Sequence, residues 1–144
     1  MKQERSFLRF EEMHMANPFV HVELQTNDLA KAKAFYSRLF DWKLEDVPMP
    51  GTGGTYTMIG VGEGTGGGML KSMALAGSPP QWLAYVGVDD VASSTRKARE
   101  LGAEVVLDKT EVGDFGWMSI LTDPTGATFA LWQAKQPQRS EKKK

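Results

Sequence analysis

The alternation of apolar and polar positions between residues 19 and 40 predicts a strand, a turn and a helix. In residues 19–25 the apolar set Val20, Val22 and Leu24 alternates with the polar set His21, Glu23 and Gln25. Helix-capping oxygens follow at residues 26–28, and the next run carries an apolar stripe at helical spacing, namely Leu29, Ala32, Phe35, Tyr36, Leu39 and Phe40. The apolar face of the strand is the nearest surface that can bury this stripe. The polar face therefore looks away from the helix and is the candidate for function.

The same pattern returns in the second half of the chain, which indicates a duplication. Residues 83–88 read as a strand and lead through Asp89, Asp90 and Val91 into a helical run over residues 92–101. Three strand signals follow each helix, at 42–45, 55–61 and 69–71 in the first half and at 103–107, 116–122 and 127–132 in the second. The order strand-helix-strand-strand-strand is therefore predicted twice.

The composition of the chain argues against nucleic-acid binding and against a membrane-spanning segment. With 144 residues, 41% of them hydrophobic, and a net charge of −1, the chain fits a globular domain without the basic surface that nucleic-acid binding needs. No apolar run is long enough to span a membrane, so we expect no membrane partner. The absence of cysteine excludes disulfides and thiolate metal sites, and residues 1–5 lack the apolar core of a signal peptide, so we expect a cytoplasmic protein.

We expect a single domain over residues 16–134, built from modules at about 18–72 and 81–133. Residues 1–15 are expected to be a poorly ordered leader, and residues 135–144 a mobile charged tail. Residues 62–67 match the dinucleotide motif G-x-G-x-x-G, but the Gly and Pro residues at 77–80 leave no room for the helix that such a site requires. We interpret this stretch as a glycine-rich hairpin or bulge.

Several spaced motifs together resemble the vicinal oxygen chelate superfamily, the group of glyoxalases, bleomycin-resistance proteins and ring-cleaving dioxygenases. The motifs are the helix start Asn27-Asp28-Leu29, the helix end Leu39-Phe40-Asp41-Trp42, the second helix start Asp89-Asp90-Val91, its end Leu101-Gly102-Ala103, and the turn Asp123-Pro124-Thr125-Gly126. The resemblance covers residues 18–133. It implies an α+β fold in which tandem βαβββ modules form a curved mixed sheet, the cup, with helices on the outer face.

The resemblance also implies a divalent metal in the cup, held by one ligand from each of four strands, and His21 occupies the position of the first ligand. The other positions carry residues that cannot bind a metal, namely Leu83, Ala130 and the run Gly67-Gly68-Met69. His21 and Glu23 supply at most two ligands on one strand, whereas zinc, nickel or iron requires three or four from the protein. We therefore expect no cofactor, with a divalent metal as the alternative.

The same alternation predicts a cup face that is aromatic with few polar anchors, as is typical of small-molecule pockets. The ligand-binding candidates are His21, Glu23, Gln25, Tyr85, Thr128 and Trp132. His21 and Glu23 are also the best candidates for catalysis, because they lie two residues apart on one strand face and could share a proton. Alternatively, Tyr85 and Trp132 pack against a partner subunit, and His21 is satisfied by Glu23 or by a backbone carbonyl. Parity places Trp82 on the opposite face, in the core beneath the helices.

The leading interpretation is a domain that binds a small, partly hydrophobic molecule in one cavity lined by His21, Glu23 and Trp132, in the manner of bleomycin-resistance proteins and without the usual metal. One alternative is a metal-dependent lyase, isomerase or dioxygenase of glyoxalase type with His21 as one ligand, so whether the chain is an enzyme stays open. A second alternative is an accessory module for a protein partner, in which side chains fill the cup. We also expect a homodimer, because aromatic residues such as Trp117 and Trp132 near the sheet edges would otherwise expose apolar surface.

Overall fold

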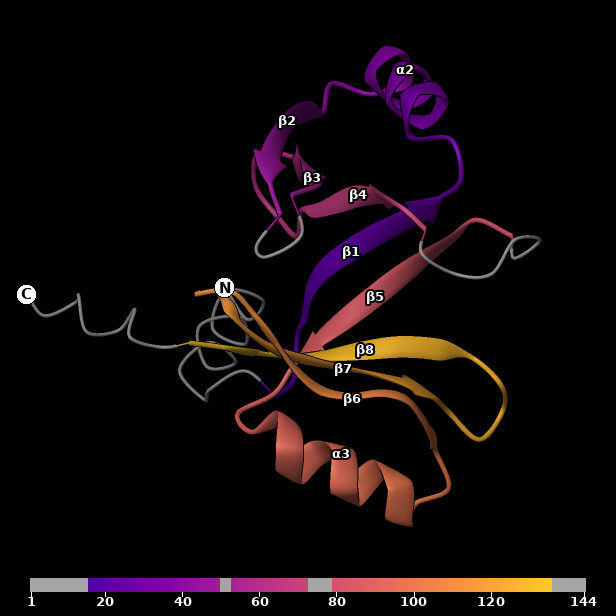
Figure 1. The fold of residues 1–144 in the computed structure, drawn as a ribbon, viewed down its shortest axis with the longest axis vertical. Helices are drawn as coiled ribbons and strands as arrows, with labels where there is room; N and C mark the ends of the chain where they lie inside the picture. The colour runs from indigo at the N-terminus through magenta and orange to yellow at the C-terminus, as the bar shows by residue number, and fades with distance from the viewer. Residues whose placement is uncertain (1–15, 50–52, 73–78, 136–144) are drawn as a thin grey trace, which may run out of the picture.

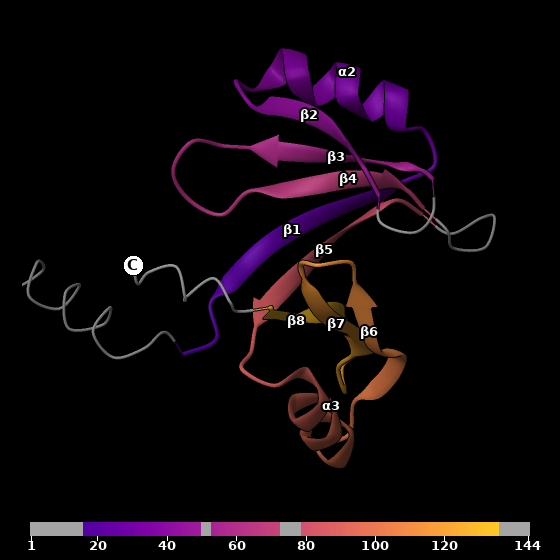
Figure 2. The ribbon, with the colours of Figure 1, turned by 60° about the vertical axis from the view of Figure 1, so that its left-hand side comes forward.

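The computed structural model describes residues 16–49, 53–72 and 79–135. In this part of the chain, two helices cover one face of a curved sheet of eight strands (Figure 1, Figure 2). The predicted α+β class and the curved mixed sheet are confirmed. The expected leader at residues 1–15 and the expected tail beyond Lys135 lie outside the described residues.

The predicted order strand-helix-strand-strand-strand occurs in both halves, which we call the first and the second module. The first module consists of β1 (Phe19–Thr26), α2 (Leu29–Leu39), β2 (Lys43–Pro48), β3 (Thr55–Gly60) and β4 (Gly67–Lys71). The second module consists of β5 (Gln81–Gly87), α3 (Val91–Glu100), β6 (Glu104–Val112), β7 (Gly116–Thr122) and β8 (Thr128–Ala134). The glycine-rich segment before β4 connects two antiparallel strands, β3 and β4, so it is a hairpin rather than a dinucleotide loop.

The strand order in the sheet is β2-β3-β4-β1-β5-β8-β7-β6. Within each module the first strand pairs in parallel with the last, β1 with β4 and β5 with β8, and the remaining pairs are antiparallel. The two modules meet where β1 pairs antiparallel with β5 in the middle of the sheet (Figure 1). We call the sheet face that the helices leave uncovered the cup face.

The two helices begin in the same way, so the two modules can be aligned on their helix caps. The Asp28 carboxylate accepts a hydrogen bond from the backbone N–H of Lys31 at 3.0 Å, and the Asp90 carboxylate accepts one from the N–H of Ser93 at 3.2 Å. Each aspartate satisfies a backbone donor that the first helical turn would otherwise leave unpaired. Counting back equally from these two caps pairs His21 of β1 with Leu83 of β5.

The apolar core lies on both faces of the sheet. Beneath α2 it is formed by Leu24, Ile59 and Met69, and between α3 and the sheet by Val91 of the helix with Leu121 and Leu131. On the cup face of the second module, a third cluster is formed by Leu83, Tyr85 and Ala130, with Met118, Ile120 and Trp132 packed against it. The alternation therefore separates a helix face from a cup face in both modules, as predicted.

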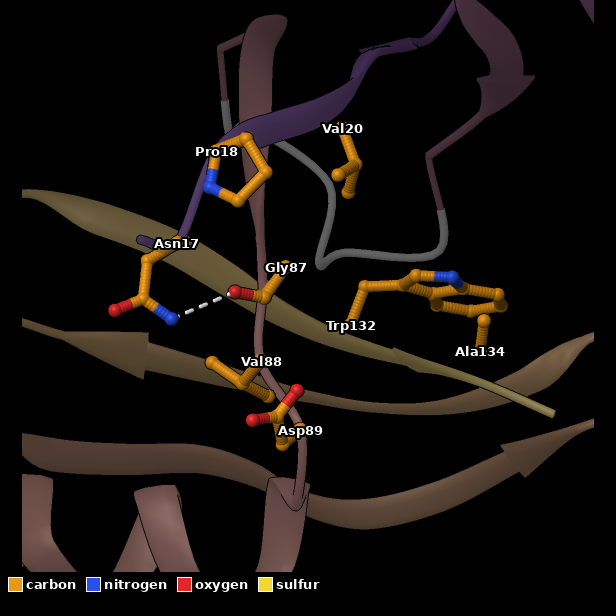
Figure 3. Close-up of a pocket in the computed structure, with 8 residues that line it drawn as sticks. All are labelled: Asn17, Pro18, Val20, Gly87, Val88, Asp89, Trp132 and Ala134. Carbon is orange, nitrogen blue, oxygen red and sulfur yellow. Dashed lines mark hydrogen bonds between the residues drawn. The ribbon is translucent and has the colours of Figure 1, made fainter. Parts of the chain in front are cut away.

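Val20 lies on the cup side of β1 rather than beneath α2, which corrects the predicted alternation at this position. The register between β1 and β5 shifts between Phe19 and His21, so β1 holds an extra residue there. Such a β-bulge interrupts the regular alternation of side chains. A Cβ at Gly87 would lie 3.1 Å from Val20 Cγ1, and Figure 3 shows Val20 on the same side of the strands as Trp132.

Helix α2 buries only part of its predicted apolar stripe. Leu29, Ala32 and Tyr36 pack against the core, whereas Phe35, Leu39 and Phe40 remain 57%, 55% and 44% exposed. Two tryptophans pack beside Tyr36, with ring centroids 5.6 Å away for Trp42 and 5.5 Å away for Trp82. Trp82 lies on the helix side, as predicted, but it is 39% exposed and sits at the margin of the core.

Candidate functional site

A buried carboxylate, Glu23, is the centre of the polar cluster on the cup face. Its Oε1 accepts hydrogen bonds from the hydroxyls of Tyr56 at 2.9 Å and Tyr85 at 3.1 Å. The side-chain amide of Gln25 donates to Oε2 at 2.9 Å. Burial, and then the negative charge of Glu23, raise the pKa values of both tyrosines, so their hydroxyls stay protonated and can donate. The Glu23 side chain is buried, with 6% of the residue exposed. The three hydrogen bonds offset the free energy that burying its carboxylate costs.

His21 extends this cluster through Tyr56. Its Nε2 lies 2.8 Å from the Tyr56 hydroxyl, and its ring meets the Tyr85 ring edge-on with centroids 5.3 Å apart. A tyrosine hydroxyl has one proton, and that of Tyr56 is donated to Glu23, so His21 donates from Nε2 and keeps Nδ1 as an acceptor. Burial lowers the pKa of His21, and the charge of Glu23 opposes this only in part. The ring is therefore neutral at pH 7.

Tyr56 is the member of the cluster that sequence reasoning missed. It lies on β3, where either face of residues 55–60 carries a similar mixture of polar and apolar side chains, so parity does not single it out. The signal that could have found it is the glycine run at 66–68. A Cβ at Gly68 would lie 2.2 Å from the Tyr56 phenol, so this glycine leaves the space through which Tyr56 reaches Glu23.

The structure brings five of the six predicted ligand-binding residues into one neighbourhood. Four are joined directly or through Tyr56 by hydrogen bonds, namely His21, Glu23, Gln25 and Tyr85. Trp132 joins through ring packing on Tyr85, with centroids 6.4 Å apart. Thr128 is not brought to the cluster, because it begins β8 and its hydroxyl lies 3.4 Å from that of Thr122 on the neighbouring strand. A residue not predicted, Gln81, adds to the cluster by donating to the Gln25 side chain at 3.3 Å.

Trp132 lines an open pocket of about 340 Å³ at the ends of β5 and β8 (Figure 3). Its lining residues are Asn17, Pro18, Val20, Gly87, Val88, Asp89, Trp132 and Ala134. His21 and Glu23 are not among them, so this pocket is not the cavity predicted for all three side chains. Tyr85 connects the two places, because it packs on Trp132 and donates to Glu23.

The residues at the family's metal-ligand positions do not fit a metal. Leu83 and Ala130 are buried and apolar, and Gly68 faces the cup without a side chain. Glu23 and His21 already bind Tyr56 and other side chains, and moving them onto an ion would leave buried tyrosine hydroxyls without partners. Within residues 16–49, 53–72 and 79–135, no group of three or more His, Cys, Asp or Glu side chains is close enough to hold an ion.

Comparison with known proteins identifies the family. The family model for the Glyoxalase/Bleomycin resistance protein/Dioxygenase superfamily matches residues 19–131. CFP32 of Mycobacterium tuberculosis, whose name reads "Putative glyoxylase CFP32", is 43% identical over 117 residues, covering 80% of this chain and 45% of CFP32. DnrV of Streptomyces peucetius, named as an anthracycline biosynthesis protein, is 28% identical over 128 residues, covering 77% of this chain and 45% of DnrV. The chain thus spans less than half the length of these relatives.

A solved structure shows the same fold at low sequence identity. Methylmalonyl-CoA epimerase from Mycobacterium tuberculosis superposes with a TM-score of 0.64 and 15% identity, over 85% of this chain and 91% of the epimerase. In the described part of the chain, neither helix is long and apolar enough to cross a membrane. The tandem modules, the curved sheet and the family match lead to one conclusion: the chain belongs to the Glyoxalase/Bleomycin resistance protein/Dioxygenase superfamily.

Proposed function

We propose that this chain binds a small, partly hydrophobic molecule at the cup, and that it does so without the divalent metal of its family. The observation that carries the proposal is the pairing of Glu23 with Tyr56 and Tyr85 at the place where metal ligands would be expected. These hydrogen bonds, rather than bonds to a metal, hold the polar side chains in place at the centre of the sheet. Trp132 and Tyr85 add the apolar wall that a small organic ligand needs.

Chemistry at this site would have to come from His21, because its neutral ring keeps Nδ1 as an acceptor. Glu23 cannot serve a ligand in the same way, since it is buried and already holds three donors. A glyoxylase activity is not transferred from CFP32, of which this chain matches 45%. Binding is therefore the function we propose, and turnover is not part of it.

Elemental analysis tests the metal-free half of the proposal. Protein purified without chelator should contain no stoichiometric divalent ion, because Leu83, Ala130 and Gly68 offer no ligand atoms. Near one equivalent of zinc, nickel, iron or manganese, removable by chelator with a change in the tryptophan spectrum, would favour a metal-dependent lyase or dioxygenase instead.

Fluorescence quenching tests the binding half. Para-iodobenzyl alcohol is a small aromatic probe whose iodine quenches a tryptophan in contact with it. We expect saturable quenching in the native protein, lost in Trp132→Phe and kept in Trp117→Phe, because Trp117 lies on the helix side of β7. Quenching that rises linearly without saturation in all three proteins would contradict the proposal.

A further inference from the structure

The pocket beside Trp132 is lined by apolar side chains and carries negative charge. Its apolar wall is formed by Pro18, Val20 and the indole of Trp132, and its only ionisable side chain among the described residues is Asp89. The Asn17 amide donates one of its two N–H groups to the Gly87 carbonyl at 2.9 Å, and its oxygen can act as an acceptor. Figure 3 shows the Asp89 carboxylate near the end of β5, and the Asn17 amide with its nitrogen toward the Gly87 carbonyl and its oxygen pointing away from Trp132. The charge that the pocket lining presents is therefore negative.

A second negative charge lies behind the pocket wall. Glu23 has no cationic partner among the described residues, whose ion pairs join Lys33 to Asp46, Arg99 to Asp108 and Lys135 to Glu111. Tyr85 connects this carboxylate to the indole of Trp132. A buried charge is screened less than an exposed one, so its potential extends into the neighbouring pocket.

From this geometry we infer that the pocket takes a hydrophobic organic cation, an aromatic or bulky apolar group that carries a protonated amine. The inference rests on the proposed function and names the ligand class for it. The apolar part of such a ligand lies against Trp132 and Val20, and its ammonium group faces Asp89 and the indole ring, which attracts a cation over its face. An anionic ligand of the same shape is disfavoured by Asp89 and Glu23 together.

An isosteric series tests the inference directly. Para-iodobenzylamine, para-iodobenzyl alcohol and para-iodobenzoate differ mainly in charge, which is positive, zero and negative at pH 7. We expect the amine to bind about tenfold more tightly than the alcohol, a difference of about 1.4 kcal/mol, and the benzoate to bind more weakly than both. The preference for the amine should shrink as the salt concentration rises.

Two charge-neutralising variants locate the source of the preference. Asp89→Asn should reduce the ratio of amine to alcohol affinity several-fold. Glu104→Gln, which removes an equal charge at the start of β6, should leave that ratio unchanged. Circular dichroism and the unfolding midpoint should show that both variants remain folded, since both side chains are exposed.

The outcomes separate this inference from the proposed function. Equal affinity for all three probes, or an amine preference that persists in Asp89→Asn, would overturn the cation specificity while leaving the binding of small hydrophobic molecules intact. Failure of all three probes to quench Trp132 saturably would overturn both.

Discussion

At the scale of single residues, Gly68 determines whether the polar cluster can form. Replacing Gly68 by Ala places a methyl group where the Tyr56 phenol lies, since a Cβ there would come within 2.2 Å of it. Tyr56 must then leave Glu23 and His21, so we expect a loss of about 1–3 kcal/mol in the free energy of unfolding. Urea denaturation measures this loss.

The matched control is Gly60→Ala at the end of β3, where the nearest atoms to a new Cβ are 3.7 Å away. We expect this variant to stay within about 0.5 kcal/mol of the native protein. Equal costs for Gly68→Ala and Gly60→Ala would show that the glycine does not act through Tyr56.

The ionisation of His21 predicts a specific pH dependence of stability. Because burial lowers its pKa in the folded state, the unfolded chain binds the proton more readily as the pH falls below about 6.5, so stability is lost in that direction. In His21→Gln the loss between about pH 6.5 and pH 5 should be smaller, since Gln does not titrate. His14 lies outside the described residues and is present in both proteins, so it does not affect the comparison.

Urea midpoints of the native and variant proteins at several pH values across this window measure the difference. Parallel curves for the two proteins would show that folding does not lower the pKa of His21. Carboxylates with lowered pKa values, such as Asp46, Glu111 and Asp123, lose their contribution at lower pH and are shared by both proteins.

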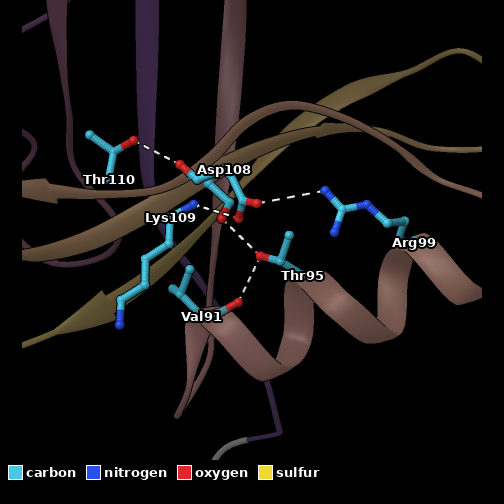
Figure 4. A network of polar contacts seen from close by, with 7 residues as sticks. Val91, Thr95, Arg99, Asp108, Lys109 and Thr110 are labelled. Carbon is cyan, nitrogen blue, oxygen red and sulfur yellow. Dashed lines mark hydrogen bonds and ion pairs between the residues drawn. The ribbon is translucent and has the colours of Figure 1, made fainter.

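At the scale of elements, α3 is docked through a buried pair of hydroxyls. Thr95 donates to the Val91 carbonyl at 2.7 Å (Figure 4), and its hydroxyl oxygen lies 2.8 Å from that of Ser119 on β7. The Thr95 proton is committed to the carbonyl, so Ser119 is the donor in the second bond. Thr95→Val therefore leaves a fully buried serine hydroxyl without this partner, and we expect a cost of about 1–3 kcal/mol.

A double-mutant cycle tests this account of the interface between α3 and β7. Adding Ser119→Ala to Thr95→Val removes the unpaired hydroxyl, so the double variant should be less destabilised than the sum of the single variants. Strict additivity would contradict the hydrogen bond. The Arg99–Asp108 pair nearby, at 3.6 Å and exposed, should contribute little, and Arg99→Ala serves as a comparison.

Element order and parity were predictable because both are local properties of the chain. We could predict the helix caps at Asp28 and Asp90 from the local sequence alone. The side-chain alternation of residues 21–25 is likewise a local pattern. Two features depended on pairing across the sheet and were not predictable locally. Val20 faces the cup because β5 imposes a bulge, and Tyr56 enters the cluster because Gly68 on the adjacent strand leaves room for it.

At the scale of the whole molecule, the exposed part of α2 is the surface most in need of a partner. The dimer was expected from exposed aromatic residues such as Trp117 and Trp132. The amino groups of Lys109 and Lys135 lie over Trp117, 5.2 Å and 5.0 Å from its ring centre, and Trp132 packs on Tyr85. Phe35, Leu39 and Phe40 of α2 are three of the exposed large hydrophobic side chains, at 57%, 55% and 44% exposure, and they follow one another along a single helix. We therefore propose that two copies of this chain pair through α2.

Light scattering at micromolar concentration measures this pairing. The native protein should have the mass of a dimer, and Leu39→Glu should shift it to a monomer, because a charge would be buried in the contact. Leu101→Glu is the control, since Leu101 is 70% exposed at the far end of α3 and should leave the dimer unchanged. A native protein of monomer mass would contradict the proposal.

The pairing of β1 with β5 has a consequence for how copies of the chain can recombine. In the described part of the chain, all strand pairing between the modules runs through these two strands. The same antiparallel contact can form between β1 of one molecule and β5 of another, because nothing in its register requires both strands to belong to one chain. Domain exchange would then rebuild the complete sheet twice, with Glu23 from one molecule meeting Tyr85 from the next.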